Sequence, residues 1–130
     1  VEQYCTHSYY VYPLIVDSNK LGIKSKIICE ALKKEGIEGL SSKYVNLHML
    51  PMFQKKIAYG SKGFPWVSEF SSNTVNYDYG ICPVAEGMQD DKYLGYSMCL
   101  HDLSNEDIQY IISTFQKVWF NLENLKLVDI

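Results

Sequence analysis

The sequence predicts an α+β fold: a small three-stranded, mainly antiparallel sheet with helices packed on one face. Strand-like and helix-like segments follow one another in the order strand, helix, short strand, loop, helix, strand, helix. A chain with three predicted strands and several helices favours a small sheet that is covered by the helices. The chain has 130 residues, of which 47% are hydrophobic and 21% charged, which is enough to bury one core.

Residues 7–17, "HSYYVYPLIVD", predict the first strand because they are rich in Tyr, Val and Ile. Pro13 indicates an edge strand or a bulge, since proline cannot donate to a ladder. Residues 24–37, "KSKIICEALKKEGI", place apolar residues on one helical face and lysines on the other, with a glycine near the end. A short second strand is predicted over 39–47. A helical turn is predicted over 50–57, where proline stands near the start.

In the second half, the segment 82–96, "CPVAEGMQDDKYLGY", predicts a helix that opens with a proline and ends before Gly95. The string "GYSMCL" (95–100) predicts the third strand. Residues 103–122 predict a long helix with Ser104 as N-cap and Asp107 three residues on. Its apolar stripe is predicted to face the core and consists of Ile108, Ile111, Ile112, Phe115, Val118 and Trp119.

Residues 55–81 show no sustained period, and six aromatic residues are interleaved with Gly, Ser, Asn and Pro. Irregular segments above about 15 residues are uncommon in compact domains unless they are functional or disordered. The aromatic content argues against a plain linker. We expect this segment either to pack on something outside the chain or to cover a ligand.

Net charge and cysteine spacing narrow the function classes. The net charge is −3 and the pI about 5.5, which argues against nucleic acid or an anionic membrane as a partner. We find no apolar run of transmembrane length and expect a cytoplasmic protein. The four cysteines lack paired spacing, so we expect no metal site and interpret them as reduced, mostly buried thiols. All twelve basic residues are lysines, so an anionic ligand would meet no arginine.

No catalytic residue is assigned. Cys99 and His101 are two apart and would share a strand face, but no third orienting residue or oxyanion-hole motif accompanies them. Neither a GxGxxG nor a GxxxxGK[ST] phosphate-binding motif occurs.

Five segments in order carry a family resemblance: "YYVYPLIV", "ALKKEGI", "YVNLHMLPMF", "CPVAEGM" and "LHDLSNEDIQYIISTFQKV". Together they resemble the C-terminal domain of the PLP-dependent sugar aminotransferases of the DegT/DnrJ/StrS family, the small domain of a fold-type I aminotransferase. The resemblance implies a single C-terminal domain over residues 1–130, with the N-terminal PLP-binding domain absent.

The resemblance also implies a function for the full-length parent. The parent would transfer an amino group from glutamate or glutamine to a keto group of a nucleotide-linked sugar or cyclitol. It would bind pyridoxal 5'-phosphate and form a homodimer. In this family the cofactor lysine lies in a Ser-x-x-x-Lys context, and neither "SNKLGIKSK" nor "GSKGFPW" matches it. We therefore expect this chain to bind no cofactor and to be inactive alone.

The resemblance points to Tyr44, His48, Lys43 and Trp66 as substrate-binding residues. Tyr44 and His48 lie in the segment that in this family runs beside the cleft. Lys43 stands where the family usually has a histidine and could offer a charge to a diphosphate. The structural alternatives stay open: His48 as a satisfied histidine between loop and core, and Lys43 as a solvated side chain. For the whole chain, the alternative is a non-catalytic α+β interaction or ligand-sensing module.

Overall fold

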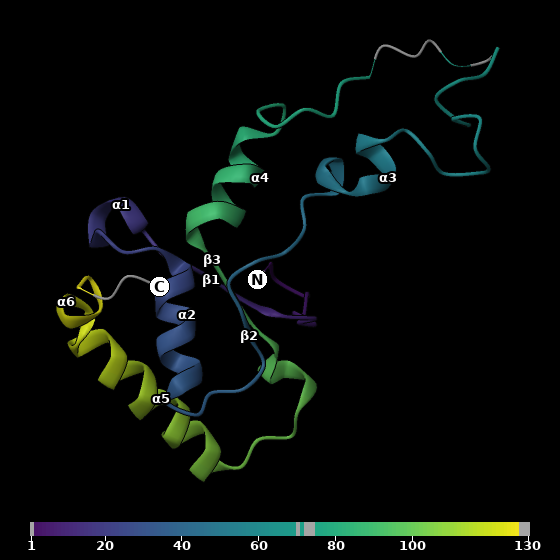
Figure 1. Ribbon diagram of the computed structural model, residues 1–130. Helices are drawn as coiled ribbons and strands as arrows, with labels where there is room; N and C mark the ends of the chain where they lie inside the picture. Colours follow the sequence, from purple (N-terminus) through teal and green to yellow (C-terminus); the bar gives the residue numbers. More distant parts are fainter. Residues whose placement is uncertain (1, 70, 72–74, 128–130) are drawn as a thin grey trace. The chain divides into compact units, whose positions relative to one another are not determined.

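The computed structural model describes residues 2–69, 71 and 75–127. The chain divides into two compact units, which we name by their content. The sheet unit consists of Val1–Lys43 with Asp90–Ile130, and the loop unit consists of Tyr44–Gln89. Figure 1 labels the helices and strands of both units.

The sheet has three strands: β1 (Tyr12–Ile15), β2 (Leu40–Ser41) and β3 (Tyr93–Tyr96), in the order β1-β3-β2. Both neighbouring pairs are antiparallel, which confirms the predicted fold class. Strand β1 lies at an edge of the sheet, and its Pro13 pairs with Gly95 of β3. Proline is tolerated at this edge position although it has no N–H to donate.

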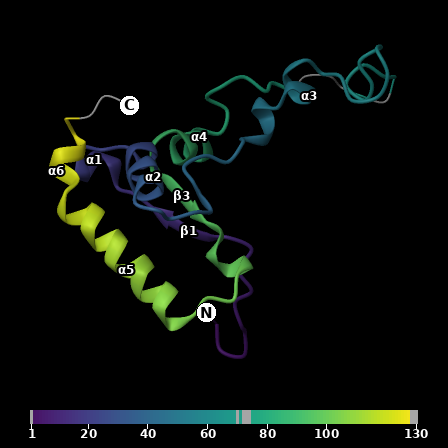
Figure 2. The same cartoon turned by 60° about the horizontal axis from the view of Figure 1, so that its bottom comes forward.

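The α-helices in the described part of the sheet unit are α1 (Ser18–Leu21), α2 (Ser25–Lys34), α5 (Asn105–Phe120) and α6 (Leu122–Leu125). Figures 1 and 2 show α2 and α5 lying alongside each other. The core between sheet and helices is formed by Val16, Ile23, Ile28, Cys29, Leu32, Ile37, Leu40, Leu94, Tyr96, Val118 and Leu122.

Side-chain alternation on β3 explains which sheet face is buried. Leu94 and Tyr96 lie two residues apart, share a face and are buried, and the Tyr96 ring lies 6.3 Å from that of Phe115 on α5. On the other face, Gly95 leaves room for the phenol of Tyr93, since a Cβ there would lie 2.7 Å from the Tyr93 Cζ.

Helix α2 ends as its sequence predicts. Glu35 is the C-cap, and Gly36 follows it at φ +94°, a left-handed conformation that glycine adopts without strain. Helix α3 (Pro51–Gln54) likewise begins at the predicted proline. Helix α5 has the predicted capping box, in which Ser104 and Asp107 exchange hydrogen bonds between side chain and backbone.

The predicted core stripe of α5 is wrong for half of its members. Ile111, Phe115 and Val118 face the core, together with Thr114. Ile108, Ile112 and Trp119 are 37%, 44% and 48% exposed. The six residues span a wider arc of the helix than the neighbouring core covers, so one edge of the stripe stays outside.

Three strand predictions are corrected. The second strand is Leu40–Ser41 rather than residues 39–47, and Leu47–Met49 at the end of that range forms a 3₁₀ turn. The first strand is limited to Tyr12–Ile15 rather than residues 7–17, because β3 offers only four residues as partners. The third strand is Tyr93–Tyr96, and Ser97–Leu100 forms a 3₁₀ helix (η3) instead of continuing it. Cys99 and His101 therefore do not share a strand face, and the premise of a Cys–His pair is wrong.

The remaining corrections concern one helix and the cysteines. The helix predicted over 82–96 is shorter: α4 (Pro83–Gly87) is followed by a π-helical turn, Met88–Lys92. Of the four cysteines only Cys29 is buried, and Cys5, Cys82 and Cys99 are exposed free thiols.

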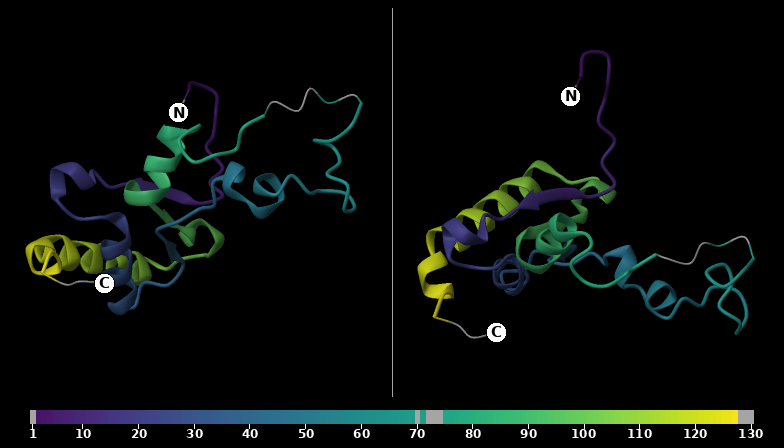
Figure 3. Two further views of the ribbon diagram at one scale, coloured as in Figure 1. Left: turned by 45° about the horizontal axis from the view of Figure 1, so that its top comes forward. Right: turned by 90° about the horizontal axis from the view of Figure 1, so that it is seen from above.

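The loop unit contains a 3₁₀ turn η1 (Leu47–Met49), α3 and α4, and Figure 3 shows the unit from two sides. The described residues between α3 and α4 form turns and bends, with one isolated β-bridge between Tyr59 and Phe64. Three aromatic side chains pack together in this unit. The ring centroid of Phe53 lies 6.0 Å from that of Trp66 and 5.3 Å from that of Tyr77. No helix in the described part of the chain is both long and apolar enough to cross a membrane.

Candidate functional site

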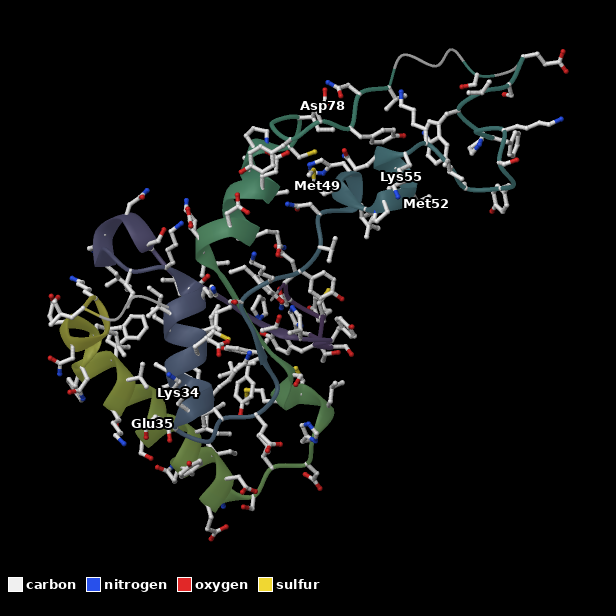
Figure 4. All side chains as sticks on the ribbon, in the orientation of Figure 1. Lys34, Glu35, Met49, Met52, Lys55 and Asp78 are labelled. Carbon is white, nitrogen blue, oxygen red and sulfur yellow. The ribbon has the colours of Figure 1, made fainter. Side chains whose placement is uncertain are left out.

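Two segments of the loop unit run side by side and are joined by three side-chain links. The Tyr44 N–H donates to Gln89 Oε1, His48 Nε2 lies 2.8 Å from Glu86 Oε1, and Gln54 Nε2 donates to the Tyr77 carbonyl at 2.6 Å. Figure 4 labels Met49, Met52 and Lys55 on the outgoing segment and Asp78 on the returning one. These links hold together the ends of the segment predicted to be irregular.

Glu86 is the centre of the middle link. Its side chain is 1% exposed, and both carboxylate oxygens accept the Gly80 N–H, at 2.9 and 2.8 Å. The Cys82 N–H donates to Glu86 Oε1 at 3.2 Å. Gly80 has φ +103°, a conformation suited to glycine, and this turns its N–H toward the carboxylate. Because every donor is in place, a carboxylate can be buried here.

The hydrogen bonds also set the protonation state of the pair. Burial by itself raises the pKa of Glu86, but the N–H groups of Gly80 and Cys82, and then His48, outweigh it and lower that pKa. Glu86 is therefore ionised at neutral pH and can only accept hydrogen bonds. It follows that His48 Nε2 carries the hydrogen, and only Nδ1 is left for another partner.

Among the four predicted substrate-binding residues, His48 is largely buried, with its side chain 9% exposed. Its Nε2 atom is hydrogen-bonded to Glu86, as expected for a histidine with a structural role. A substrate contact through Nδ1 stays a prediction. Tyr44 precedes it on the same segment and is 53% exposed, and Lys43 ends the sheet unit as an exposed residue.

Trp66 lies in the aromatic cluster of the loop unit rather than beside His48. It is 8% exposed, and its Nε1–H donates to the Tyr77 hydroxyl at 2.9 Å. Two cavities, of about 340 and 540 Å³, flank this cluster and share Val75 and Tyr77 in their linings. A ligand would meet Trp66 through its ring in the larger cavity, because its N–H is already used.

Sequence reasoning did not single out Glu86, Gln54 or Tyr77. Glu86 stands in "CPVAEGM", a motif that was recognised, but its partner lies 38 residues away. The available signal was a carboxylate in the first turn of a five-residue helix, which by itself reads as a favourable charge at the helix N-terminus.

The lysines of the two strings nearest to the family context bear on whether this chain could hold PLP. Lys20, Lys24, Lys26 and Lys62, from the two strings nearest to the family context, are exposed. Hydrogen bonding to Asp91 raises the pKa of Lys24, whereas a lysine that attacks a carbonyl is activated by a lowered pKa. The described residues also contain no group of three or more His, Cys, Asp and Glu that could hold a metal ion.

Comparison with known proteins finds two distant relatives. The chain is 29% identical over 85 residues to the spore coat polysaccharide biosynthesis protein SpsC of Bacillus subtilis, covering 65% of this chain and 21% of SpsC. It is 32% identical over 72 residues to the uncharacterized protein MJ1066 of Methanocaldococcus jannaschii, covering 53% of this chain and 18% of that protein. The chain thus spans about a fifth of the length of these relatives. No family model and no solved structure matches it.

Proposed function

We propose that this chain is the C-terminal part of a PLP-dependent sugar aminotransferase of the DegT/DnrJ/StrS type. The whole enzyme would transfer an amino group from glutamate or glutamine to a keto group of a nucleotide-linked sugar or cyclitol. The cofactor and its lysine would come from a part of the enzyme outside this chain. The loop unit would shape the side of the cleft that receives the sugar.

The observation that carries the proposal is the His48–Glu86 bond. His48 belongs to "YVNLHMLPMF" and Glu86 to "CPVAEGM", two of the segments on which the family resemblance was recognised. The bond brings these segments together with a buried, fully partnered carboxylate. Motifs that are separate in sequence therefore form one local structure, which supports interpreting them as parts of one site.

The similarity to SpsC supports the substrate class. SpsC is named for spore coat polysaccharide biosynthesis. In our proposal His48 is held by Glu86 so that Tyr44, four residues earlier, is presented at a fixed place. Tyrosine combines an aromatic face with a hydroxyl, which suits contact with a sugar or base.

The test uses the natural, longer protein that contains this chain. PLP is added, and the visible absorbance of bound cofactor is followed before and after addition of L-glutamate. We expect cofactor binding and a spectral change with glutamate, because a half-reaction converts the cofactor to its amine form. A protein that binds no PLP would contradict the proposal and leave the interaction module as the better interpretation.

The role of the loop unit is tested on the same protein. Tyr44→Ala is expected to raise KM for the sugar nucleotide and to leave the glutamate half-reaction unchanged, because the half-reaction does not involve the sugar. Val84→Ala is the matched control, since Val84 is 80% exposed on α4 beside Glu86. Equal KM values for Tyr44→Ala and the control would show that Tyr44 does not contact the sugar nucleotide.

A further inference from the structure

A third cavity, of about 440 Å³, lies in the sheet unit and shares no residue with the candidate functional site described above. It is formed by the turn after α2, the residues that follow η3 and the first turns of α5. Its apolar lining comes from Ile37, Leu103 and Ile111, and its aromatic lining from Tyr96 and Tyr110.

The wall formed by the turn after α2 is held in place from two sides. The Tyr110 hydroxyl donates to the Glu35 carbonyl at 2.6 Å, and the Ser97 hydroxyl donates to the Gly39 carbonyl at 3.0 Å. Gly36 adopts φ +94°, and a Cβ there would lie 2.7 Å from the Tyr110 hydroxyl. Figure 4 shows Glu35 at the end of α2 beside α5. The cavity is therefore preorganised rather than formed by loose side chains.

Tyr96 supplies a polar group with no internal partner. The residue is 7% exposed and lines the cavity, and its hydroxyl has no hydrogen bond to any described residue. Burial raises the pKa of Tyr96, so the hydroxyl stays protonated and neutral. A ligand in this cavity would hydrogen-bond the Tyr96 hydroxyl in place of solvent.

The charges around the cavity select the sign of a ligand. Its lining includes the carboxylates of Glu38 and Asp107 and the imidazole of His101, but no lysine. Hydrogen bonds from the side chain and backbone of Ser104 lower the pKa of Asp107, which is therefore ionised at neutral pH. Two carboxylates without an adjacent cation in the lining disfavour anions and favour a positively charged group.

We propose that this cavity binds an organic ammonium group carried on a short apolar stem. The stem would pack on Ile37, Leu103 and Ile111. The ammonium group has three N–H donors and would use the Tyr96 hydroxyl and the carboxylate of Glu38, with the tyrosine rings adding cation–π attraction. The site is independent of the proposed aminotransferase function. Its ligand is either a free alkylamine or the lysine side chain of a partner protein.

The test is an NMR titration of the ¹⁵N-labelled chain with n-pentylammonium chloride, against 1-pentanol and sodium pentanoate. We expect saturable shifts of the Gly36, Gly39 and Tyr96 amides with the amine only. Glu38→Gln is expected to weaken binding about tenfold because it removes the negative charge that attracts the ammonium group. Tyr96→Phe is expected to weaken binding about fivefold because it removes a hydrogen-bond acceptor for a charged donor. Glu106→Gln is the matched control, since Glu106 lies in the same helical turn as Asp107 and outside the lining.

Two further readouts make the result decisive. Far-UV circular dichroism of each variant shows whether the chain is folded, and Tyr96→Phe keeps the ring that packs on Phe115. A parallel titration with Nα-acetyl-lysine methylamide distinguishes the two sources of the ligand, since the backbone of a lysine peptide adds contacts that pentylamine lacks. Equal shifts with pentanol or pentanoate, no saturation with either amine, or unchanged affinity in Glu38→Gln would overturn the proposal.

Discussion

At the scale of single residues, Glu86 shows how a charge can be buried without an arginine. Two backbone N–H groups and one imidazole supply its hydrogen bonds, and the chain has only lysines as permanent cations. The carboxylate thereby fixes the Gly80–Cys82 turn and the orientation of the His48 ring at once.

Replacing Glu86 by Gln is expected to release this turn. The amide keeps one acceptor oxygen and turns an NH₂ group toward donors, so at least one N–H loses its partner. We expect the Gly80 and Cys82 amides to exchange hydrogen about tenfold faster or more. Native-state hydrogen exchange measures this, with Val84→Ala as control. Unchanged exchange at both amides would show that Glu86 does not hold the turn.

The lowered pKa values of Glu86 and Asp107 predict a loss of stability in acid. In the unfolded chain these groups have ordinary pKa values, 4.5 and 3.8, and in the folded chain both values are lower. Their contribution is therefore fully present above these ordinary values. As pH falls below them, the unfolded state binds more protons and the contribution is lost.

Urea unfolding at a series of pH values tests this expectation. The free energy of unfolding is expected to fall as pH drops through the range below 4.5. Asp107→Asn is expected to be less stable at neutral pH and to show a smaller loss in acid, because one of the two titrating groups is gone. An identical acid loss in the variant would mean that Asp107 does not contribute.

Residues with local partners could be predicted from the sequence, and residues with distant partners could not. Ser104 and Asp107 are three apart, so their mutual bonds follow from spacing. The carboxylate that holds His48 is 38 residues away, and nothing in the local pattern of either residue indicates the other. The sequence therefore led to the histidine but not to the group that orients it.

At the scale of elements, the same distinction explains which predictions were correct. The boundaries of α2 and α5 follow from Gly36 and Ser104, residues that act on their own helix. Strand β3, "YLGY", has a glycine in its interior, which weakens a strand signal. It is a strand because it pairs with β1 on one side and β2 on the other, and these partners are far away in sequence.

Removing the N-cap of α5 is expected to weaken the sheet unit. Ser104→Ala loses the bond to the Asp107 N–H and should lower the free energy of unfolding by about 1 kcal/mol. Ser113→Ala on the same helix is the control, because the Ser113 hydroxyl donates to the Tyr110 carbonyl within the helix and does not cap it. Chemical denaturation measures both variants. The expectation fails if both show the same stability.

At the scale of the whole molecule, burial is concentrated in the sheet unit. Its core includes Ile28, Leu32 and Leu94, all at most 2% exposed. In the described loop unit, the buried side chains are Trp66 and Glu86, and the regular elements have at most five residues. The sheet unit therefore supplies most of the hydrophobic stabilisation that the described structure shows.

Leu32→Ala is expected to destabilise the chain by about 2–5 kcal/mol, because the side chain is fully buried and leaves a cavity between α2 and the sheet. Ile112→Ala is the matched control, since Ile112 is 44% exposed on α5. It should cost much less. Thermal and urea unfolding compare the two. Equal losses would mean that Ile112 is packed in solution and that the exposed edge of α5 is covered.

The three links of the loop unit have a consequence for how such proteins diversify. Tyr44–Gln89, His48–Glu86 and Gln54–Tyr77 fix where the chain leaves and where it returns. Apart from Trp66, which contacts Phe53 and Tyr77, the residues between positions 57 and 75 can therefore change in number or composition while the anchoring pairs keep their geometry, since loop closure depends only weakly on loop length. Evolution, or a protein engineer, could thus exchange this segment as a self-contained insert and alter what it touches while the rest of the fold is retained.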